Sequence, residues 1–412
     1  MQRNAKHQPG SPAGFQTALE GIRVADFSRV VAGPFCTMNL ADFGAEVIKV
    51  EPPRIGDPQR YAPPVPEGAE GNGGFFLLFN RNKKSLGLDM AHPGARKALE
   101  RLIERSDVLV ENFKPGTMEK FGLGYEQARK INPSIIYASL SGFGQTGPWS
   151  KRPAFDLIVQ ALSGAMSITG YPDDPPTRVG FDVSDFTGGV YLAFGIVLAL
   201  FHRQRTGQGQ LVDFSMLDGL ISILGSAVME YLLMGSIARP EGGRHPHDAP
   251  HGVYECSDGY VALGTVTPNI WKKVCEIIKR PDLWEDPSLR DPSGRAAKRD
   301  MIDKIVQQWI GGRSCDEIED ILEAAGIPHG KVNNLGEALE MDVLAAREMI
   351  VEFDHPKIGR LRVPGQPVKM SETPGRMSSR PPLLGEHTRE ILIGVLGLSE
   401  PEVDELARCG AI

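Results

Sequence analysis

A regular alternation of short apolar segments with amphipathic ones runs through the first third of the chain, and it constrains the fold more than any other feature. Strand-like segments are predicted at residues 21–27, 45–50, 85–89, 107–112 and 134–140. Gly33-Pro34 opens a helix after the first segment and Gly44 ends it, because proline suits a helix start and glycine the position after its end. Helices are also predicted at 92–106 and 124–131. This alternation indicates a parallel sheet covered by helices, so we predict an α/β fold.

The rest of the chain is predicted to contain long apolar helices and two hairpins. The helices are predicted at 155–166, 186–204, 211–234 and 388–396, with others up to residue 326. The hairpins are predicted at 252–264 and 353–363. A polar stretch rich in proline, glycine and histidine, 239–251, is typical of a domain boundary. The apolar run 190–201 is too short to span a bilayer and indicates a buried helix.

Charge and cysteine content exclude several classes of protein. The chain has 45 Lys and Arg against 52 Asp and Glu, a net charge of −7, which argues against nucleic-acid and anionic-membrane partners. Five scattered cysteines without a CxxC motif indicate a reducing compartment, the cytoplasm, and no thiolate zinc site. Residues 1–18 are polar and show no signal-peptide core. No dinucleotide, P-loop, zinc-protease or nucleophile-elbow motif is present.

Six short motifs follow one another along most of the chain. They are Asp26–Phe35, Leu40–Glu51, Asn80–Ser85, Asp107–Phe113, Ser141–Pro148 and Pro381–Thr388. In this order they resemble the family III CoA-transferases, which include formyl-CoA transferase, carnitine CoA-transferase, succinyl-CoA:glutarate CoA-transferase and α-methylacyl-CoA racemase. The resemblance runs from about residue 19 to the C-terminus.

The resemblance implies a fold and an assembly. Two chains are expected to thread through each other as interlocked rings in a homodimer. Each is expected to have a Rossmann-like large domain, built from both chain ends, and a smaller α+β domain. Residues 19–238 are predicted to form the first part of the large domain, 239–334 the small domain, and 335–412 a linker and the return to the large domain.

The resemblance makes Asp185, in the segment Asp182–Gly189, the catalytic nucleophile. An aspartate with its usual pKa near ~4 is ionised at pH 7 and could attack an acyl-CoA thioester without a general base. The expected intermediates are an aspartyl anhydride and then an aspartyl-CoA thioester. By position alone, Asp185 fits better as the N-cap of a helix beginning near Thr187. The flanking motifs favour the catalytic role.

Other site residues are implied by residue-by-residue similarity to formyl-CoA transferase. CoA contacts are expected at Val31, Ala32, Arg54, Leu88, Asp89, Met90, Ala91, Glu111, Asn112, Phe113, Lys120, Phe155 and Asp156. Residues 88–91 are expected to hold the adenine end. Asn112 fits a strand end equally well, and Lys120 a solvated surface charge. Backbone N–H groups of Gly242 and Gly243 are the candidates for an oxyanion loop.

Three activities are considered. The resemblance favours transfer of CoA from an acyl-CoA, such as succinyl-CoA, to a free carboxylic acid, with CoA as substrate and no tightly bound cofactor or metal. The racemase branch of the resembled family carries a histidine before the aspartate that matches Asp156, and Phe155 at that position cannot transfer a proton. A non-catalytic CoA-binding protein would bind CoA without turnover.

Two groups of side chains have no fixed place in the sequence-based picture. A distal substrate carboxylate could pair with Arg29, Arg152 or Arg178, but sequence alone does not position these side chains. His245, His247 and His251 fit a polar lid better than a metal site.

Overall fold

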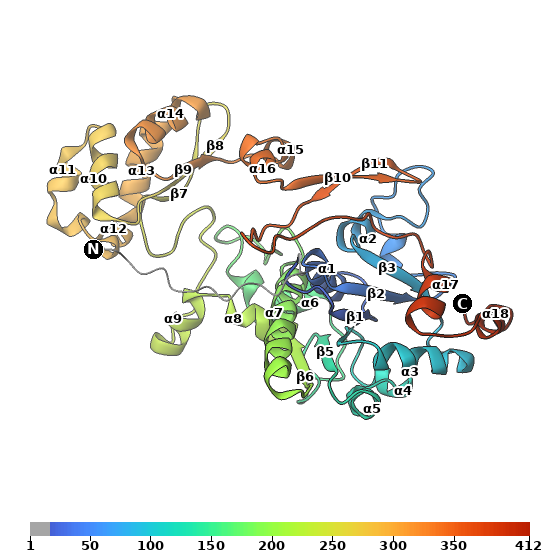
Figure 1. Ribbon diagram of the computed structural model, residues 1–412. Coiled ribbons are helices and arrows are strands. Elements are labelled where there is room, and N and C mark those ends of the chain that lie inside the picture. Colours follow the sequence, from blue (N-terminus) through green and yellow to red (C-terminus); the bar gives the residue numbers. More distant parts are fainter. Residues whose placement is uncertain (1–16) are drawn as a thin grey trace, which may run out of the picture. The chain divides into compact units, whose positions relative to one another are not determined.

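Six parallel strands form the central sheet, in the order β3-β2-β1-β4-β5-β6 (Figure 1). The computed structural model describes residues 17–412, so most of the predicted signal-free segment 1–18 lies outside the described residues. The strands are β1 (Arg23–Asp26), β2 (Glu46–Glu51), β3 (Lys83–Gly87), β4 (Val108–Glu111), β5 (Ile136–Ser141) and β6 (Leu211–Ser215). Each of the five strands predicted above overlaps one of the first five, which confirms the parallel α/β sheet.

The sixth strand corrects the helix predicted at 211–234. Leu211–Ser215 pairs in parallel with β5, with Tyr137 opposite Leu211, and the chain then forms two short helices, α8 (Met216–Ser222) and α9 (Ser226–Met234). Val212 and Phe214 are partly buried, whereas Leu211 and Asp213 are exposed. This alternation suits an edge strand. The strand is short, and the apolar residues that follow it make the whole segment 211–234 look like one apolar helix in the sequence.

Helices cover both faces of the sheet. On one face lie α1 (Ala32–Asp42), α6 (Asp156–Ser163), α7 (Val183–Thr206) and α8. On the other face lie α3 (Arg96–Glu104), α5 (Tyr125–Ile131), α17 (Thr388–Glu390) with the π-helical turn Ile391–Val395, and α18 (Glu400–Arg408). Two more short helices are α2 (Gly74–Phe79) and α4 (Thr117–Lys120). The fold therefore buries the sheet between two apolar layers, as a parallel sheet requires.

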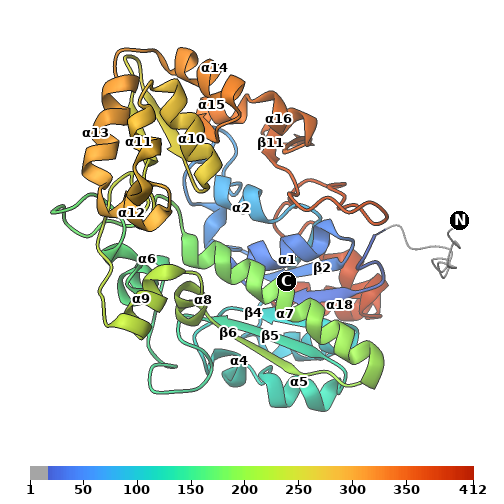
Figure 2. The same ribbon diagram turned by 90° about the vertical axis from the view of Figure 1, so that its left-hand side faces the viewer.

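Helices α1 and α7 lie side by side over the sheet (Figure 2). Gly189 permits this close approach, because a Cβ atom there would lie 2.8 Å from the carbonyl oxygen of Ala32. The tight packing of α7 on α1 matters for the site, because the first turn of α7 carries Asp185.

Helix α7 is longer and more exposed than the buried helix predicted at 186–204. Leu192, Ile196 and Ala199 are buried, but Val190 and Phe194 are 55% and 59% exposed, so the prediction fails for one face. Among the described residues, α7 is long and apolar enough to cross a membrane, and so are α8 and α9 if taken as one span bent by 81°. Core helices of soluble proteins meet the same criterion, and α7 packs along one side on the sheet layer.

The C-terminal segment returns to the sheet. The second predicted hairpin is confirmed as β10 (Ile350–His355) and β11 (Gly359–Pro364). His387 then joins the segment to β3: Ser85 N donates to its Nδ1 at 3.2 Å, and its own N–H donates to Ser85 O at 3.1 Å. The helix predicted at 388–396 corresponds to α17 and the π-helical turn, and α18 was not predicted.

The chain divides into two compact units, the first formed by 17–165, 179–228 and 343–412, the second by 166–178 and 229–342. The first predicted hairpin is confirmed in the second unit as β7 (His251–Glu255) and β8 (Tyr260–Gly264), and β9 (His329–Lys331) pairs with β8. The remaining helices are α10 (Pro268–Ile277), α11 (Pro281–Glu285), α12 (Pro292–Ala297), α13 (Arg299–Ile310), α14 (Cys315–Ala325), α15 (Leu335–Leu339) and α16 (Asp342–Ala346). The predicted boundaries at 239 and 334 remain predictions about separately folding domains.

Candidate active site

The site lies where the strand order of the sheet reverses. Strand β1 is flanked by β2 on one side and β4 on the other, and in open α/β sheets ligands bind at the carboxyl ends of the strands at such a point. A cavity of about 590 Å³ is lined by the loops after β1, β4 and β5 and by Asp185. A second cavity, of about 320 Å³, is lined by residues that follow β1, β2 and β3. Both cavities lie within the first unit.

Asp185 occupies the third position of α7, not the N-cap of a helix beginning near Thr187. The helix begins at Val183, two residues before Asp185, and Asp182 stands at its N-cap. Ser184, the residue before Asp185, anchors the start of the helix. Its backbone N and its Oγ each donate to Asp156 Oδ1 at 2.7 Å. The N-cap interpretation of Asp185 is therefore wrong, and its side chain faces the larger cavity.

The Asp185 carboxylate is partly buried and accepts no hydrogen bond from any residue that the structure describes. Burial, and then the neighbouring carboxylates of Asp156 and Asp182, raise the pKa of Asp185 to about 7. The sequence-based expectation of an ordinary pKa is therefore wrong for this chain. A poorly solvated carboxylate that ionises near neutral pH is typical of a functional group rather than a structural one.

Four predicted residues share the larger cavity with Asp185: Val31, Asn112, Phe113 and Phe155. Val31 is buried, whereas Phe155 is 72% exposed. Asn112 also has a structural role, because its Oδ1 accepts from Arg29 N and its Nδ2 donates to Arg29 O, both at 2.8 Å. The two interpretations of Asn112 are therefore compatible.

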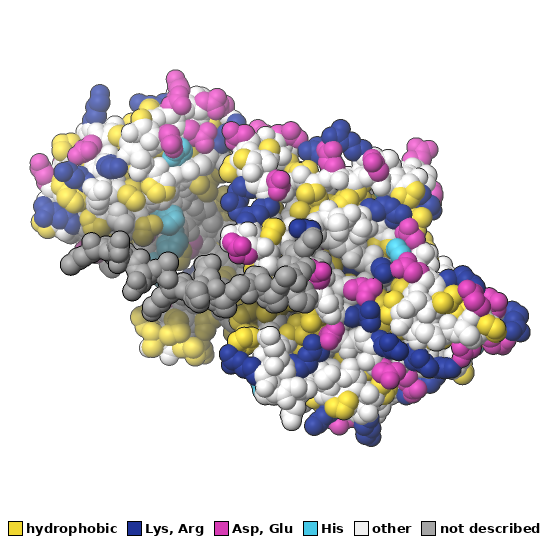
Figure 3. Space-filling model, in the orientation of Figure 1, with side chains coloured by type: hydrophobic (Ala, Val, Ile, Leu, Met, Phe, Trp, Pro, Cys, Tyr) yellow, Lys and Arg dark blue, Asp and Glu magenta, His cyan; other side chains and the backbone are white. Residues whose placement is uncertain are grey.

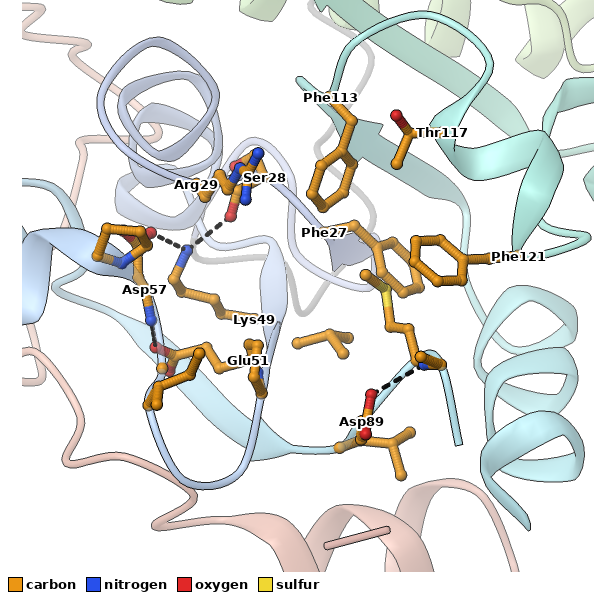
Figure 4. Close-up of a pocket in the computed structure, with 18 residues that line it drawn as sticks. Phe27, Ser28, Arg29, Lys49, Glu51, Asp57, Asp89, Phe113, Thr117 and Phe121 are labelled. Atoms are coloured by element: carbon orange, nitrogen blue, oxygen red, sulfur yellow. Dashed lines mark hydrogen bonds and ion pairs between the residues drawn. The ribbon is translucent and has the colours of Figure 1, made fainter. Parts of the chain in front are cut away.

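The smaller cavity contains the predicted adenine-binding segment, residues 88–91, together with Phe113 (Figure 4). Its wall carries the aromatic rings of Phe27, Phe113 and Phe121 (Figure 4). Asp89 accepts a hydrogen bond from Ala91 N at 2.9 Å, which shapes the turn after β3. Arg29, Pro58 and Phe113 line both cavities, so the two spaces adjoin.

Comparison with known proteins decides the family. The model of CoA-transferase family III matches residues 19–388. The chain belongs to this family. It is therefore a CoA-transferase, and the resemblance drawn from the six motifs is confirmed.

Individual relatives cover nearly the whole chain. The CoA-transferase is 42% identical over 382 residues to succinyl-CoA:mesaconate CoA-transferase of Haloarcula hispanica. This match covers 91% of this chain and 96% of the relative. It is 36% identical over 405 residues to succinyl-CoA:glutarate CoA-transferase of Mus musculus, with 98% and 92% covered. A solved CAIB/BAIF family protein from Brucella suis matches with a TM-score of 0.81 at 32% identity, covering 92% of this chain and 100% of that one.

Five predicted CoA contacts of the CoA-transferase line neither cavity: Ala32, Arg54, Glu111, Lys120 and Asp156. Ala32, Glu111 and Asp156 are buried, whereas Arg54 and Lys120 are exposed. The Glu111 carboxylate accepts from Phe113 N at 2.8 Å and from the Ser139 hydroxyl, so it positions the cavity residue Phe113. Burial raises the pKa of Glu111 to about 7. The exposed position of Lys120 agrees with the solvated-charge interpretation.

Gly242 and Gly243 lie in the second unit, where close packing explains why both positions are glycine. Gly242 N donates to Gly170 O at 2.9 Å, and a Cβ atom at Gly242 would lie 2.7 Å from the Tyr171 ring. A Cβ atom at Gly243 would lie 2.9 Å from Val253 Cβ. The Gly242 amide is already bonded, and the oxyanion loop remains a prediction.

The histidines of the loop 245–251 interact with one another and with Glu230. The rings of His245 and His251 stack with centroids 4.4 Å apart, and His247 Nε2 lies 2.9 Å from Glu230 Oε1. Within residues 17–412, no group of three or more His, Cys, Asp or Glu side chains is arranged to hold a metal ion.

Sequence reasoning missed the buried charges that hold the cavity loop in place. Lys49 Nζ lies 3.0 Å from Asp57 Oδ2 and donates to Ser28 O at 2.8 Å (Figure 4). Asp57 also accepts from Val30 N at 3.2 Å. Val30 has a φ of 70°, which is strained for a β-branched residue. These contacts fix the loop between β1 and α1, which carries three residues that line the larger cavity, Arg29, Val30 and Val31.

Four more residues line the Asp185 cavity. Sequence reasoning named two of them without a position and did not name the other two as site residues. Arg29 and Arg152 line it, as do Gln59 and Ser141, whereas Arg178 lines neither cavity. The available signal was position: Arg29 follows the first predicted strand, and Ser141 and Arg152 follow the fifth. Carboxyl ends of parallel strands gather at one edge of a sheet.

Proposed function

We propose that this CoA-transferase moves CoA from succinyl-CoA, or another short acyl-CoA, to a free carboxylic acid through covalent intermediates on Asp185. One observation carries the proposal: an unpaired carboxylate with a raised pKa lines a cavity that adjoins a second cavity containing the predicted CoA-binding segment, residues 88–91. Succinyl-CoA is the donor named for both relatives described above, and it is the donor that the sequence resemblance favours.

The reaction needs no water and no external base. An oxygen of Asp185 attacks the thioester carbonyl carbon, the C–S bond breaks, and CoA leaves as a thiolate. This step forms an anhydride between Asp185 and the donor acid. The thiolate then attacks the Asp185 carbonyl carbon, which breaks the C–O bond and releases the donor acid as a carboxylate. The acceptor carboxylate reverses both steps and leaves with CoA.

The cavity residues would bind, orient and shield these intermediates. Residues 88–91 and Phe113 provide the apolar wall for the adenine end, and Val31 and Phe155 provide the wall beside Asp185. Apolar walls exclude water, which would otherwise hydrolyse the anhydride.

The two other activities have weaker support. A racemase would need a proton-transferring side chain where Phe155 lines the cavity, and a phenyl ring has no exchangeable proton. A non-catalytic CoA-binding protein would not need a partly buried carboxylate with a raised pKa in this cavity. Both relatives described above are named as transferases.

An exchange experiment tests the proposed function. Succinyl-, acetyl-, glutaryl- and butyryl-CoA would each be incubated with a panel of free carboxylic acids, and new CoA thioesters would be detected by mass spectrometry. We expect new thioesters with succinyl-CoA as donor and none without enzyme. If no pairing yields a new thioester but deuterium from solvent enters the α-carbon of an acyl-CoA, the racemase reading replaces the transferase.

The pH dependence follows from the raised pKa of Asp185. Because the nucleophile must be ionised, kcat/KM for the donor should rise about tenfold per pH unit below pH 7 and level off above it. The profile would be measured between about pH 5 and pH 9 with succinyl-CoA as the varied substrate, since kcat/KM reports groups of the free enzyme. A rate already constant from about pH 5 upward would show that Asp185 keeps an ordinary pKa near 4.

We also propose that the CoA-transferase works as a homodimer in the cytoplasm. Val190, Phe194 and Phe201 expose an apolar strip along α7, and Leu232 and Leu233 are 68% and 75% exposed on α9, where Figure 3 shows a cluster of hydrophobic side chains. A second copy is the partner that the resemblance implies, and sedimentation velocity should give twice the mass of one chain. The five cysteines are free, which suits a reducing compartment.

A further inference from the structure

The larger cavity is lined by three cationic side chains and a single carboxylate. Arg29, Lys114 and Arg152 line it, and Asp185 is the one acidic residue among its described lining residues. A carboxylate nucleophile alone would repel a carboxylic acid substrate. The surplus of positive charge compensates for that repulsion and makes the cavity suitable for anionic substrates.

Arg29 lies where the two cavities meet. It lines both of them, and its guanidinium carbon is 4.9 Å from the centroid of the Phe113 ring. Its backbone is held on both sides by Asn112. Arg29 therefore lies, with Pro58 and Phe113, where a CoA molecule reaching from residues 88–91 to Asp185 would cross from one cavity to the other.

Arg152 lines only the cavity that contains Asp185. Its guanidinium carbon lies 4.8 Å from the centroid of the Trp149 ring and 5.8 Å from that of Phe143, and the two rings pack edge to face at 5.5 Å. Arg152 N donates to Trp149 O at 2.8 Å, which tightens the turn. No carboxylate in the described part of the chain forms an ion pair with Arg152.

This arrangement suits a planar anion. Stacking on Trp149 and Phe143 orients the guanidinium but uses none of its N–H groups. An arginine edge presents two parallel donors that match the two oxygens of a carboxylate. A lysine at this place would offer only a point charge.

We propose that Arg152 binds the distal carboxylate of a dicarboxylic substrate while the reacting end of that substrate lies at Asp185. The inference rests on the proposed function and adds the substrate class. The succinyl group of the proposed donor ends in a free carboxylate, and that end needs a cationic partner inside the cavity. Donor acid and acceptor acid occupy the same place in turn, so Arg152 selects dicarboxylic acids in both half-reactions.

Acceptor selectivity tests the inference. Glutarate and valerate have the same chain length and differ by one carboxylate, and each would be used as the varied acceptor at a fixed concentration of succinyl-CoA. In a double-displacement reaction, kcat/KM for the acceptor depends only on the acceptor half-reaction. We expect the wild-type enzyme to prefer glutarate by about 10- to 100-fold, the range for a charge-assisted pair. Arg152→Leu should remove most of this preference. Its kcat/KM for valerate should stay within about threefold of the wild-type value.

Two further variants complete the design. Arg152→Lys should retain part of the preference, because it keeps the charge without the paired donors. Arg205→Leu is the matched control, because Arg205 also stacks on an aromatic ring, Phe201, at 4.0 Å, but lines neither cavity. It should keep the wild-type preference.

The outcomes separate the inference from the proposed function. If wild-type enzyme transfers CoA to neither acid nor to any other, the proposed function fails and the inference with it. If Arg152→Leu transfers CoA but keeps the preference for glutarate, or loses activity equally with both acids, the inference alone is overturned. If Arg152→Leu fails to fold, two other results would overturn the inference. One is a wild-type enzyme that shows no preference for glutarate, and the other is an Arg152→Lys variant that keeps the full preference.

Discussion

Asp185→Asn is expected to lower kcat for CoA transfer by about 10⁴-fold or more, the range seen when a nucleophile is removed from an enzyme. The amide has the shape of the carboxylate but lacks the negative charge that attacks the thioester. The acyl-CoA KM should change little, because the adenine-binding segment at residues 88–91 is untouched. The rate would be measured with succinyl-CoA and its best acceptor acid.

The same variant should become more stable. Folding raises the pKa of Asp185 to about 7, so the folded state holds this proton more tightly than the unfolded state. Protonated Asp185 therefore contributes favourably to the free energy of unfolding. This contribution is complete below about pH 4 and disappears as the pH rises through about 7. At pH 8, Asp185→Asn should therefore raise the free energy of unfolding by about 1–3 kcal/mol, a figure reduced for partial exposure.

Asp218→Asn provides the control for both measurements. Asp218 also lies in the first turn of a helix, α8, but it is exposed and lines neither cavity. Its variant should keep wild-type activity and stability. A rate for Asp185→Asn within about tenfold of the wild-type rate would exclude Asp185 as the nucleophile.

Asp57→Asn is expected to lower the free energy of unfolding by about 3–5 kcal/mol, because it leaves the charge of Lys49 buried without its closest partner. The pair is part of a buried cluster that balances basic against acidic groups: Lys49, Arg60 and Lys83 against Asp26, Glu51 and Asp57. Activity should fall as well, because Asp57 holds the strained backbone of Val30 beside the cavity. Urea unfolding measures the first effect.

Two comparison variants make this result specific. Lys49→Met in the Asp57→Asn background should recover much of the lost stability, because no unpaired charge then remains. Glu402→Gln breaks an exposed ion pair with Lys97 and should lower the free energy of unfolding far less than Asp57→Asn does. Equal losses from Asp57→Asn and Glu402→Gln would contradict the role assigned to the buried cluster.

The sequence predicted the sheet and the family but not the environment of the site. Apolar segments bounded by glycine and proline located five of the six strands, because buried strands carry a continuous apolar pattern. The sixth, β6, lies at the sheet edge and exposes Leu211 and Asp213, so its pattern is weak. Helix α7 was predicted as a helix, but its exposed side is apolar, and a sequence does not distinguish an exposed apolar side from a buried one.

Sequence reasoning named Asp185 and four residues that line the same cavity. Val31, Asn112, Phe113 and Phe155 meet in one cavity because they follow strands that end at the same edge, and the first turn of α7 adds Asp185 to it. Arg54 and Lys120 do not line it, because matching a motif fixes a position along the chain and not the direction of a side chain. The raised pKa of Asp185 was beyond prediction, since it depends on burial and on Asp156, which comes from another helix.

The most direct test of covalent catalysis by Asp185 follows oxygen from the acceptor acid. Enzyme would turn over succinyl-CoA with an acceptor acid labelled with oxygen-18 in its reacting carboxylate, and the peptide containing Asp185 would then be analysed by mass spectrometry. The anhydride mechanism transfers one acceptor oxygen to the Asp185 carboxylate in each turnover, and this oxygen passes to the released donor acid in later turnovers, whenever it is the oxygen that attacks the donor. We therefore expect oxygen-18 in Asp185 and in free succinate. Label in succinate but never in Asp185 would mean that the acceptor attacks the donor directly, and the role assigned to Asp185 would be wrong.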